Sequence, residues 1–111
     1  GEVKQLYFQG QDARRHGRTN AAIRLYKQAL AADPDYDPAA HALGTIYFNR
    51  RNYEAAIRYE RRAAKAAPRV ASYQLALGDY YFRSGKRDEA ATHWKKASRL
   101  GSRLAKTRLS E

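Results

Sequence analysis

The residue types that most often do chemistry are few in this chain and far apart. The three histidines, His16, His41 and His93, are separated by 25 and 52 residues, so they lack the short spacings of a metal site. Cysteine is absent, which removes thiolate ligands, disulfides and a cysteine nucleophile. No phosphate-cradling glycine loop or nucleophile elbow is present either. We therefore expect no catalytic residues, no metal and no cofactor, and predict that the protein is not an enzyme.

Two acid pairs could supply a general acid and a general base. They are Glu54 with Glu60 and Asp88 with Glu89. Acidic residues are favoured at helix starts by the helix dipole and pair with basic residues one helical turn away. We interpret all four as helix-start or ion-pair residues, and His16 and His93 as surface or packing residues.

Charge is the outlying feature of the composition. The 22 lysines and arginines exceed the 11 aspartates and glutamates, which gives a net charge of +11. Residues 1–49 hold six basic and five acidic residues, whereas residues 50–111 hold 16 and six. Because a surplus of one sign attracts partners of the other, an anion-attracting surface is expected in the C-terminal half. The absence of cysteine and of a long apolar run favours a cytoplasmic protein, with the periplasm left open.

A step of 34 residues organises the chain. Gly10, Gly44 and Gly78 stand at this interval, as do Pro34 and Pro68. Such a period indicates a helical repeat array rather than a single irregular fold. The same interval separates the alanines Ala22, Ala56 and Ala90, the alanines Ala29, Ala63 and Ala97, and, over two steps, Gly17 and Gly85.

The apolar residues within each period recur at spacings of three and four, as amphipathic helices require. Asp37 before Pro38 predicts a helix start with Asp37 as the side-chain cap, and Gly17 and Gly85 suit the left-handed residue that ends a helix. Small residues at Gly10 and its equivalents should let two helices approach closely. The predicted helices span about 2–15, 19–32, 37–50, 53–66, 71–84 and 87–100, followed by a short capping helix over about 102–110.

The period and its motif resemble the tetratricopeptide repeat, whose pattern runs W-x2-L-G-x2-Y, A-x3-F and P. The departures are Gln9 for leucine, Ala13 for tyrosine and Glu60 where an aromatic residue is usual. The matching residues are Ala22-x3-Tyr26 and Pro34 in the first copy, Leu43-Gly44-x2-Tyr47, Ala56 and Pro68 in the second, and Leu77-Gly78-x2-Tyr81 and Ala90-x3-Trp94 in the third.

The resemblance implies an all-α fold, a right-handed superhelix (α-solenoid) of three antiparallel helix-turn-helix pairs with a capping helix. Residues 1–111 would form a single domain with repeats at about 3–36, 37–70 and 71–104. The segment after Gly101 has a second interpretation, the first helix of a fourth repeat. First helices line the concave face in this family, which predicts a groove lined by Lys4, Tyr7, Gln11, Arg14, Arg15, His41, Thr45, Phe48, Asn49, Leu75, Asp79, Phe82 and Arg83.

A groove of this kind predicts a protein-protein interaction scaffold that binds a peptide or helix of a partner. Aromatic residues would hold apolar anchors, and Arg14 and Arg83 would pair with carboxylates, so an acidic or amphipathic segment is expected. The family's clamp for a chaperone C-terminal carboxylate is not expected to form. Its lysine, asparagine and arginine positions hold Tyr7, Gln11, Ala42, Ser72 and Ala76.

A separate basic surface is expected on the convex side and the C-terminal end. It could be an ordinary solvated face, or an adaptor surface for an acidic protein, nucleic acid or anionic lipid. A self-association module is the third interpretation, because repeat ends expose apolar flanks. The residues assigned to the basic surface are Arg58, Arg61, Arg62, Lys65, Lys95, Lys96 and Arg99, with further basic residues at Lys86, Arg87, Arg103, Lys106 and Arg108.

Overall fold

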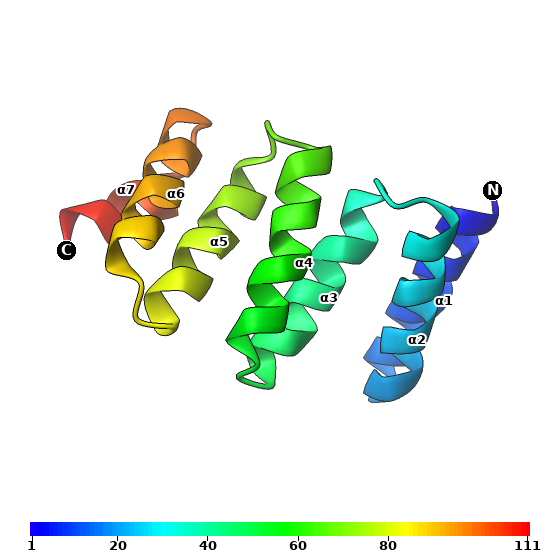
Figure 1. Ribbon diagram of the computed structural model, residues 1–111. Helices are drawn as coiled ribbons and strands as arrows, with labels where there is room; N and C mark the ends of the chain where they lie inside the picture. The colour runs from blue at the N-terminus through cyan, green and yellow to red at the C-terminus, as the bar shows by residue number, and fades with distance from the viewer.

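Seven α-helices and no strands make up the structure, a computed structural model that describes all 111 residues (Figure 1). Every predicted helix is present, and each boundary lies within one residue of its predicted place. None of the seven has the length and apolar character that a bilayer-crossing helix needs. The helices are α1 (Glu2–Arg15), α2 (Thr19–Ala32), α3 (Asp37–Asn49), α4 (Tyr53–Ala66), α5 (Ala71–Arg83), α6 (Arg87–Arg99) and α7 (Arg103–Ser110).

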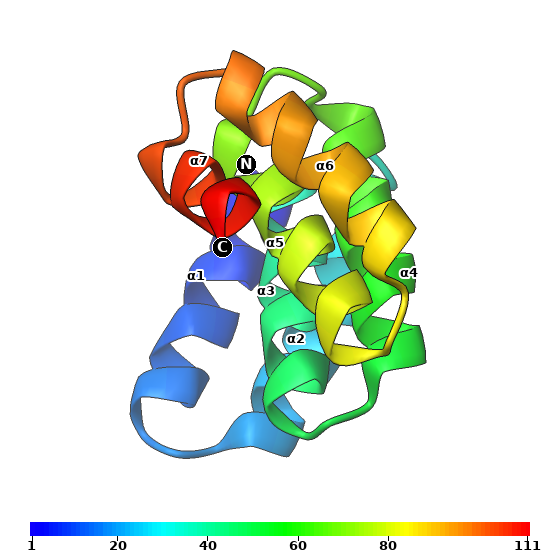
Figure 2. The same cartoon turned by 90° about the vertical axis from the view of Figure 1, so that its left-hand side faces the viewer.

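The helices pack as three consecutive pairs, α1 with α2, α3 with α4 and α5 with α6, and α7 packs on α6. The pairs stack side by side into an elongated body of 41 × 26 × 20 Å. Seen end-on, α4 and α6 lie on one side and α1 and α7 on the other (Figure 2). We call the side built from α1, α3 and α5 the first-helix face, and the side built from α2, α4 and α6 the second-helix face.

Six alanines at the 34-residue interval have no exposed surface: Ala22, Ala29, Ala56, Ala63, Ala90 and Ala97. They lie on the inner sides of α2, α4 and α6, where a larger side chain would push the paired helices apart. The repeat seen in the sequence is therefore a packing repeat, and the expectation of close helix approach at small residues is confirmed.

The glycines of the first helices make the closest approach within each pair. A Cβ placed on Gly10 would lie 2.7 Å from the ring of Tyr26, and one on Gly44 would lie 2.6 Å from Oε1 of Glu60. A Cβ on Gly78 would overlap the indole of Trp94. Each glycine therefore accommodates the side chain 16 positions later on the second helix.

The turns within the pairs end their helices on left-handed residues. Gly17 has φ +73° and Gly85 has φ +87°, as predicted. The equivalent residue of the middle pair is Arg51, with φ +63°, a conformation that costs a residue with a Cβ about 1 to 2 kcal/mol. The middle pair thus has the same left-handed turn as the outer pairs, but with arginine in place of glycine.

The prediction that Asp37 caps α3 is wrong. Tyr36 occupies the N-cap position and no side chain accepts from the first turn there. Asp37 is already helical, and its carboxylate accepts a 2.6 Å hydrogen bond from the hydroxyl of Tyr73 on α5. The residue joins two neighbouring repeats instead. Side-chain caps occur elsewhere, since Asn52 accepts from the amide of Ala55 at the start of α4.

Candidate functional site

A cavity of about 810 Å³ opens on the first-helix face between the third repeat and α7. Phe48 comes from α3, and Arg108 comes from α7. The second repeat, the third repeat and the capping helix therefore build this site together. The lining residues are Phe48, Ser72, Leu75, Ala76, Asp79, Tyr80, Phe82, Arg83, Arg87, Trp94, Arg108 and Glu111.

Aromatic rings supply the apolar part of this cavity. Phe48 stacks on Tyr80 with ring centroids 4.5 Å apart, and Phe82 lies 5.5 Å from Trp94 in a tilted arrangement. Phe82 nevertheless keeps 44% of its surface exposed. Rings that already contact each other lose little conformational freedom on binding, so this wall is pre-organised for an apolar side chain.

Two arginines lie over these rings. The guanidinium carbon of Arg83 is 5.5 Å from the ring centroid of Phe48, and that of Arg87 is 5.7 Å from the ring centroid of Phe82. Neither arginine forms an ion pair. The ring faces attract the two guanidinium groups, whose N–H donors stay available to a carboxylate.

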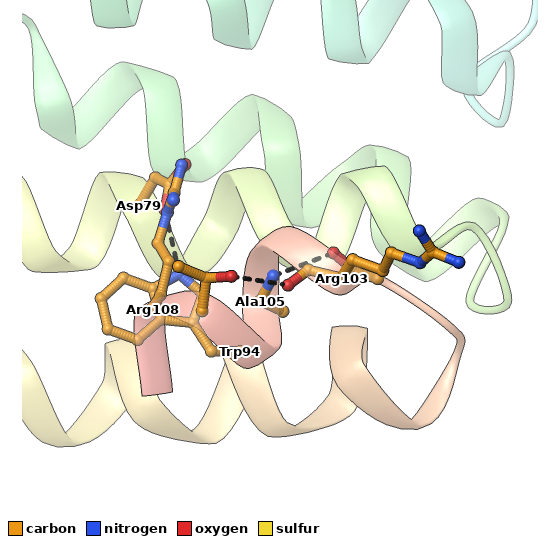
Figure 3. Close-up of polar contacts among 7 residues, drawn as sticks. Asp79, Trp94, Arg103, Ala105 and Arg108 are labelled. Carbon is orange, nitrogen blue, oxygen red and sulfur yellow. Dashed lines mark hydrogen bonds and ion pairs between the residues drawn. The ribbon is translucent and has the colours of Figure 1, made fainter. Parts of the chain in front are cut away.

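Asp79 joins three helices at one end of the cavity. Its Oδ1 accepts a 3.0 Å hydrogen bond from Nε1 of Trp94. Arg108 donates to both oxygens, from Nε at 2.6 Å and from Nη2 at 3.1 Å, as Figure 3 shows. This bond is the first cause of the raised pKa of Arg108. Asp79 was predicted as a groove residue and lines the cavity, and its carboxylate also holds α7 against the third repeat.

The middle repeat buries a carboxyl group beneath its groove position. Nδ1 of His41 lies 2.7 Å from Oε2 of Glu60, whose side chain has no exposed surface. The other oxygen, Oε1, has no partner. Burial raises the pKa of Glu60, and the hydrogen bond and charge of His41 oppose the rise. Thr45 donates to the carbonyl of His41 at 3.1 Å, while Asn49 is exposed at the end of α3.

In the first repeat, two predicted groove residues contact side chains of α2 and of the following loop rather than an open groove. Tyr7 lies between Tyr26 and Tyr36, with ring centroids 5.8 and 5.7 Å away. Gln11 accepts a hydrogen bond from the hydroxyl of Tyr26. Arg14 is half-buried. Tyr7, Tyr26 and Tyr36 form a packed ring cluster, and none of the predicted groove residues of this repeat lines the cavity.

The cavity therefore brings together only part of the predicted groove. Tyr80, Arg87, Trp94 and Arg108 were not predicted as lining residues. The 34-residue period places Trp94 opposite a glycine, and this pattern could have identified Trp94 as a lining residue. The position of Arg108 in the cavity depends instead on how α7 packs against the third repeat. The predicted residues in the cavity are Phe48, Leu75, Asp79, Phe82 and Arg83, and those outside it are Lys4, Tyr7, Gln11, Arg14, Arg15, His41, Thr45 and Asn49.

A second recess, of about 620 Å³, lies between α4 and the turn before α6. Arg58 and Arg61 line it together with Lys86. The remaining residues assigned to the basic surface are exposed on α4 and α6: Arg62, Lys65, Lys95, Lys96 and Arg99.

Comparison with known protein families accounts for this architecture. A sequence profile described as the tetratricopeptide repeat matches residues 13–80, which is more than half of the chain. The chain belongs to the tetratricopeptide repeat family. It has three repeats and a capping helix, as predicted, and the helices form the α-solenoid expected of the family. No curated protein sequence matches this chain.

Several solved structures share this fold. A mutant O-GlcNAc transferase of Thermobaculum terrenum is 30% identical with a TM-score of 0.83, over 97% of this chain and 21% of that one. The first repeat domain of Spaghetti (RPAP3), bound to the HSP90 peptide SRMEEVD, is 19% identical with a TM-score of 0.89, over 98% and 88%. MamA is 26% identical with a TM-score of 0.86, over 95% and 61%. The chain thus spans about a fifth of the transferase.

Proposed function

We propose that this chain is a non-catalytic interaction scaffold that holds a segment of a partner protein in the cavity between α3, α5, α6 and α7. The carrying observation is the pair of arginines, Arg83 and Arg87, which lie over the rings of Phe48 and Phe82 without a carboxylate partner. The tetratricopeptide fold is a protein-protein interaction module, and this cavity is the part of it with both an apolar wall and free cationic donors.

The cavity favours a bulky apolar residue next to one or more carboxylates. Phe82 and its neighbouring rings supply the area that an apolar anchor would bury, at roughly 25 cal/mol per Å². The free N–H edges of the two arginines match the two oxygens of a carboxylate. Asp79 is neutralised by Arg108, so it opposes an acidic ligand less than an unpaired aspartate would.

A chaperone C-terminal carboxylate is not the proposed ligand. Ala42 is buried, and Ser72 and Ala76 line the cavity without supplying a charge. The solenoid that binds SRMEEVD shows that this fold can hold an acidic peptide, but it is too distant in sequence to name the ligand of this chain. The acidic preference proposed here comes from Arg83 and Arg87 instead.

Selection from a peptide display library tests the proposal. The wild type should enrich peptides that combine glutamate or aspartate with an aromatic or large aliphatic residue. The double variant Phe82→Ala/Arg83→Gln removes one exposed anchor and one donor, and should lose at least about 10-fold in affinity for these peptides. The matched control Phe8→Ala/Arg15→Gln changes an exposed phenylalanine and an exposed arginine on α1 and should keep wild-type affinity.

Circular dichroism should show unchanged helix content in both variants. Equal losses in the two variants, or enrichment of basic peptides, would contradict the proposal. Self-association is the competing use of the same surface, and it would appear as a mass that rises with concentration in sedimentation and falls in the Phe82→Ala/Arg83→Gln variant.

A further inference from the structure

The second-helix face carries cations that aromatic rings hold in place. Nζ of Lys27 on α2 lies 5.9 Å from the ring centroid of Tyr47. That ring is stacked on Tyr59, 5.6 Å away, and Arg58 and Arg62 lie 5.4 and 5.9 Å from the centroid of Tyr59. The interactions run from α2 to α4 across two repeats. They fix long side chains that would otherwise move freely in solvent.

The recess of about 620 Å³ continues this arrangement toward α6. Arg58, Arg61 and Lys86 line it, together with Ser84 from the turn before α6. Glu54 is the single acidic residue in the lining, and none of the three cations forms an ion pair. The three cations around this recess therefore have N–H donors available to bind an anion.

His93 marks where the positive charges of α4 and α6 converge. Its ring stacks on Tyr81, 5.3 Å away. Burial lowers the pKa of His93 first, and the charges of Lys96 and Arg61 lower it further. Arg61 also lines the recess, so the cations of the two helices act on one region.

Helix dipoles explain part of this pattern. Glu54 stands in the first turn of α4, and Asp88 and Glu89 in the first turn of α6, where negative charge is favoured. The dipole acts only within the first and last turns. It does not account for Arg58 and Arg61, which lie in the middle of α4 beside the recess and form no ion pair.

We propose that this recess and the flanking cations form a binding site for the phosphate backbone of nucleic acid, independent of the peptide cavity. The distribution of exposed apolar side chains favours nucleic acid over a protein as the ligand of this face. The exposed large hydrophobic residues are Phe8, Phe82, Leu104 and Leu109, and none is on α2, α4 or α6. A protein interface needs buried apolar anchors, and a membrane-surface helix needs apolar residues to insert. A phosphate backbone binds through charge alone.

Binding of a fluorescein-labelled single-stranded oligonucleotide of about 20 nucleotides, longer than typical single-strand sites, measures the effect. The wild type should bind it with a strong salt dependence. The triple variant Arg58→Gln/Arg61→Gln/Lys86→Gln should lose about 100-fold in affinity near 0.1 M salt. Its slope of log affinity against log salt should be smaller by about 2, because three phosphate contacts are gone.

A matched triple variant separates a site from net charge. Lys4→Gln/Arg15→Gln/Arg18→Gln removes the same charge from exposed positions in and just after α1, and should stay within about threefold of the wild type. Circular dichroism should report intact helices in both.

Three results would overturn the proposal: no binding by the wild type, equal losses in the two triple variants, or equal competition by polyglutamate of matched charge, which would indicate an acidic protein. Vesicles containing phosphatidylserine that retain the wild type more strongly than the oligonucleotide does would assign the face to a membrane and would likewise overturn it. The result of the peptide selection at the first-helix cavity does not affect any of these oligonucleotide measurements. Either proposal can therefore be contradicted without affecting the other.

Discussion

The middle repeat and the two outer repeats solve the same packing problem in different ways. The side chain opposite the first-helix glycine is Tyr26 in the first repeat, Trp94 in the third and Glu60 in the second. The two rings send their polar atom back to the first helix, to Gln11 and to Asp79. Glu60 also bonds the first helix, at His41, but it leaves one buried oxygen without a partner.

This difference indicates that the middle repeat is the less stable part of the array. A buried carboxylate loses its hydration, and an unpartnered buried oxygen costs about 1 to 3 kcal/mol. The turn of the same repeat holds Arg51 in a left-handed conformation where the outer repeats have glycine. We therefore expect both features to lower the stability of the repeat that supplies Phe48 to the cavity.

The largest expected effect concerns the glycines. Gly78→Ala would place a methyl group inside the indole of Trp94, a buried ring with little room to move, and should lower the free energy of unfolding by about 2 to 3 kcal/mol. Gly44→Ala meets the tip of a carboxyl side chain and should cost about 1 kcal/mol, partly offset by helix propensity. Urea denaturation measures both. An equal or greater loss in Gly44→Ala would contradict the comparison.

The next effect depends on pH. Burial raises the pKa of Glu60 above its ordinary 4.5, so the folded state holds this proton more firmly than the unfolded state does. The associated stability is present below pH 4.5 and is lost as the pH rises through the folded-state pKa. Glu60→Gln does not titrate. The stability of this variant relative to the wild type should therefore rise with pH, as urea denaturation at several pH values would show; a constant difference would mean that Glu60 does not carry the cost.

The attachment of α7 gives a smaller effect. Asp79→Asn removes the charge that Arg108 contacts with two donors but keeps an acceptor for Trp94. Because the side chains of Arg108 and Asp79 are 34% and 29% exposed, the loss should be only about 1 kcal/mol. Faster amide hydrogen exchange confined to α7 would identify the cause. The control Asp12→Asn breaks an exposed pair with Arg15 and should change almost nothing.

The smallest expected effect is a gain. Arg51→Gly removes the strain of the left-handed residue in the middle turn. The greater freedom of glycine in the unfolded state offsets part of this gain, so the chain should be stabilised by only about 0.5 to 1 kcal/mol. Gly85→Ala, at the equivalent turn of the third repeat, should lose a similar amount. Thermal unfolding measures both changes, and a loss in Arg51→Gly would show that its side chain makes a contact worth more than the strain.

The sequence predicted the helices closely because the period places a small residue and a large one at fixed positions in every repeat. It also predicted that Phe48, Phe82 and Arg83 share a face, because the resemblance to the tetratricopeptide repeat implies this, and all three line the cavity. It could not predict that Asp79 is taken by Arg108, or that Asp37 bonds Tyr73, because both depend on how neighbouring helices dock. Glu60 was recognised as a departure, but its bond to His41 required the structure.

Fluorescence of Trp94 tests the proposed function most directly, because it is the only tryptophan of the chain and lines the cavity. The probes are a capped peptide with one phenylalanine flanked by glutamates and a matched peptide with lysines. The acidic peptide should change the emission of the wild type in a saturable way, and Arg83→Gln/Arg87→Gln should weaken this at least about 10-fold. No change with the acidic peptide, or an equal response to the lysine peptide, would contradict the account.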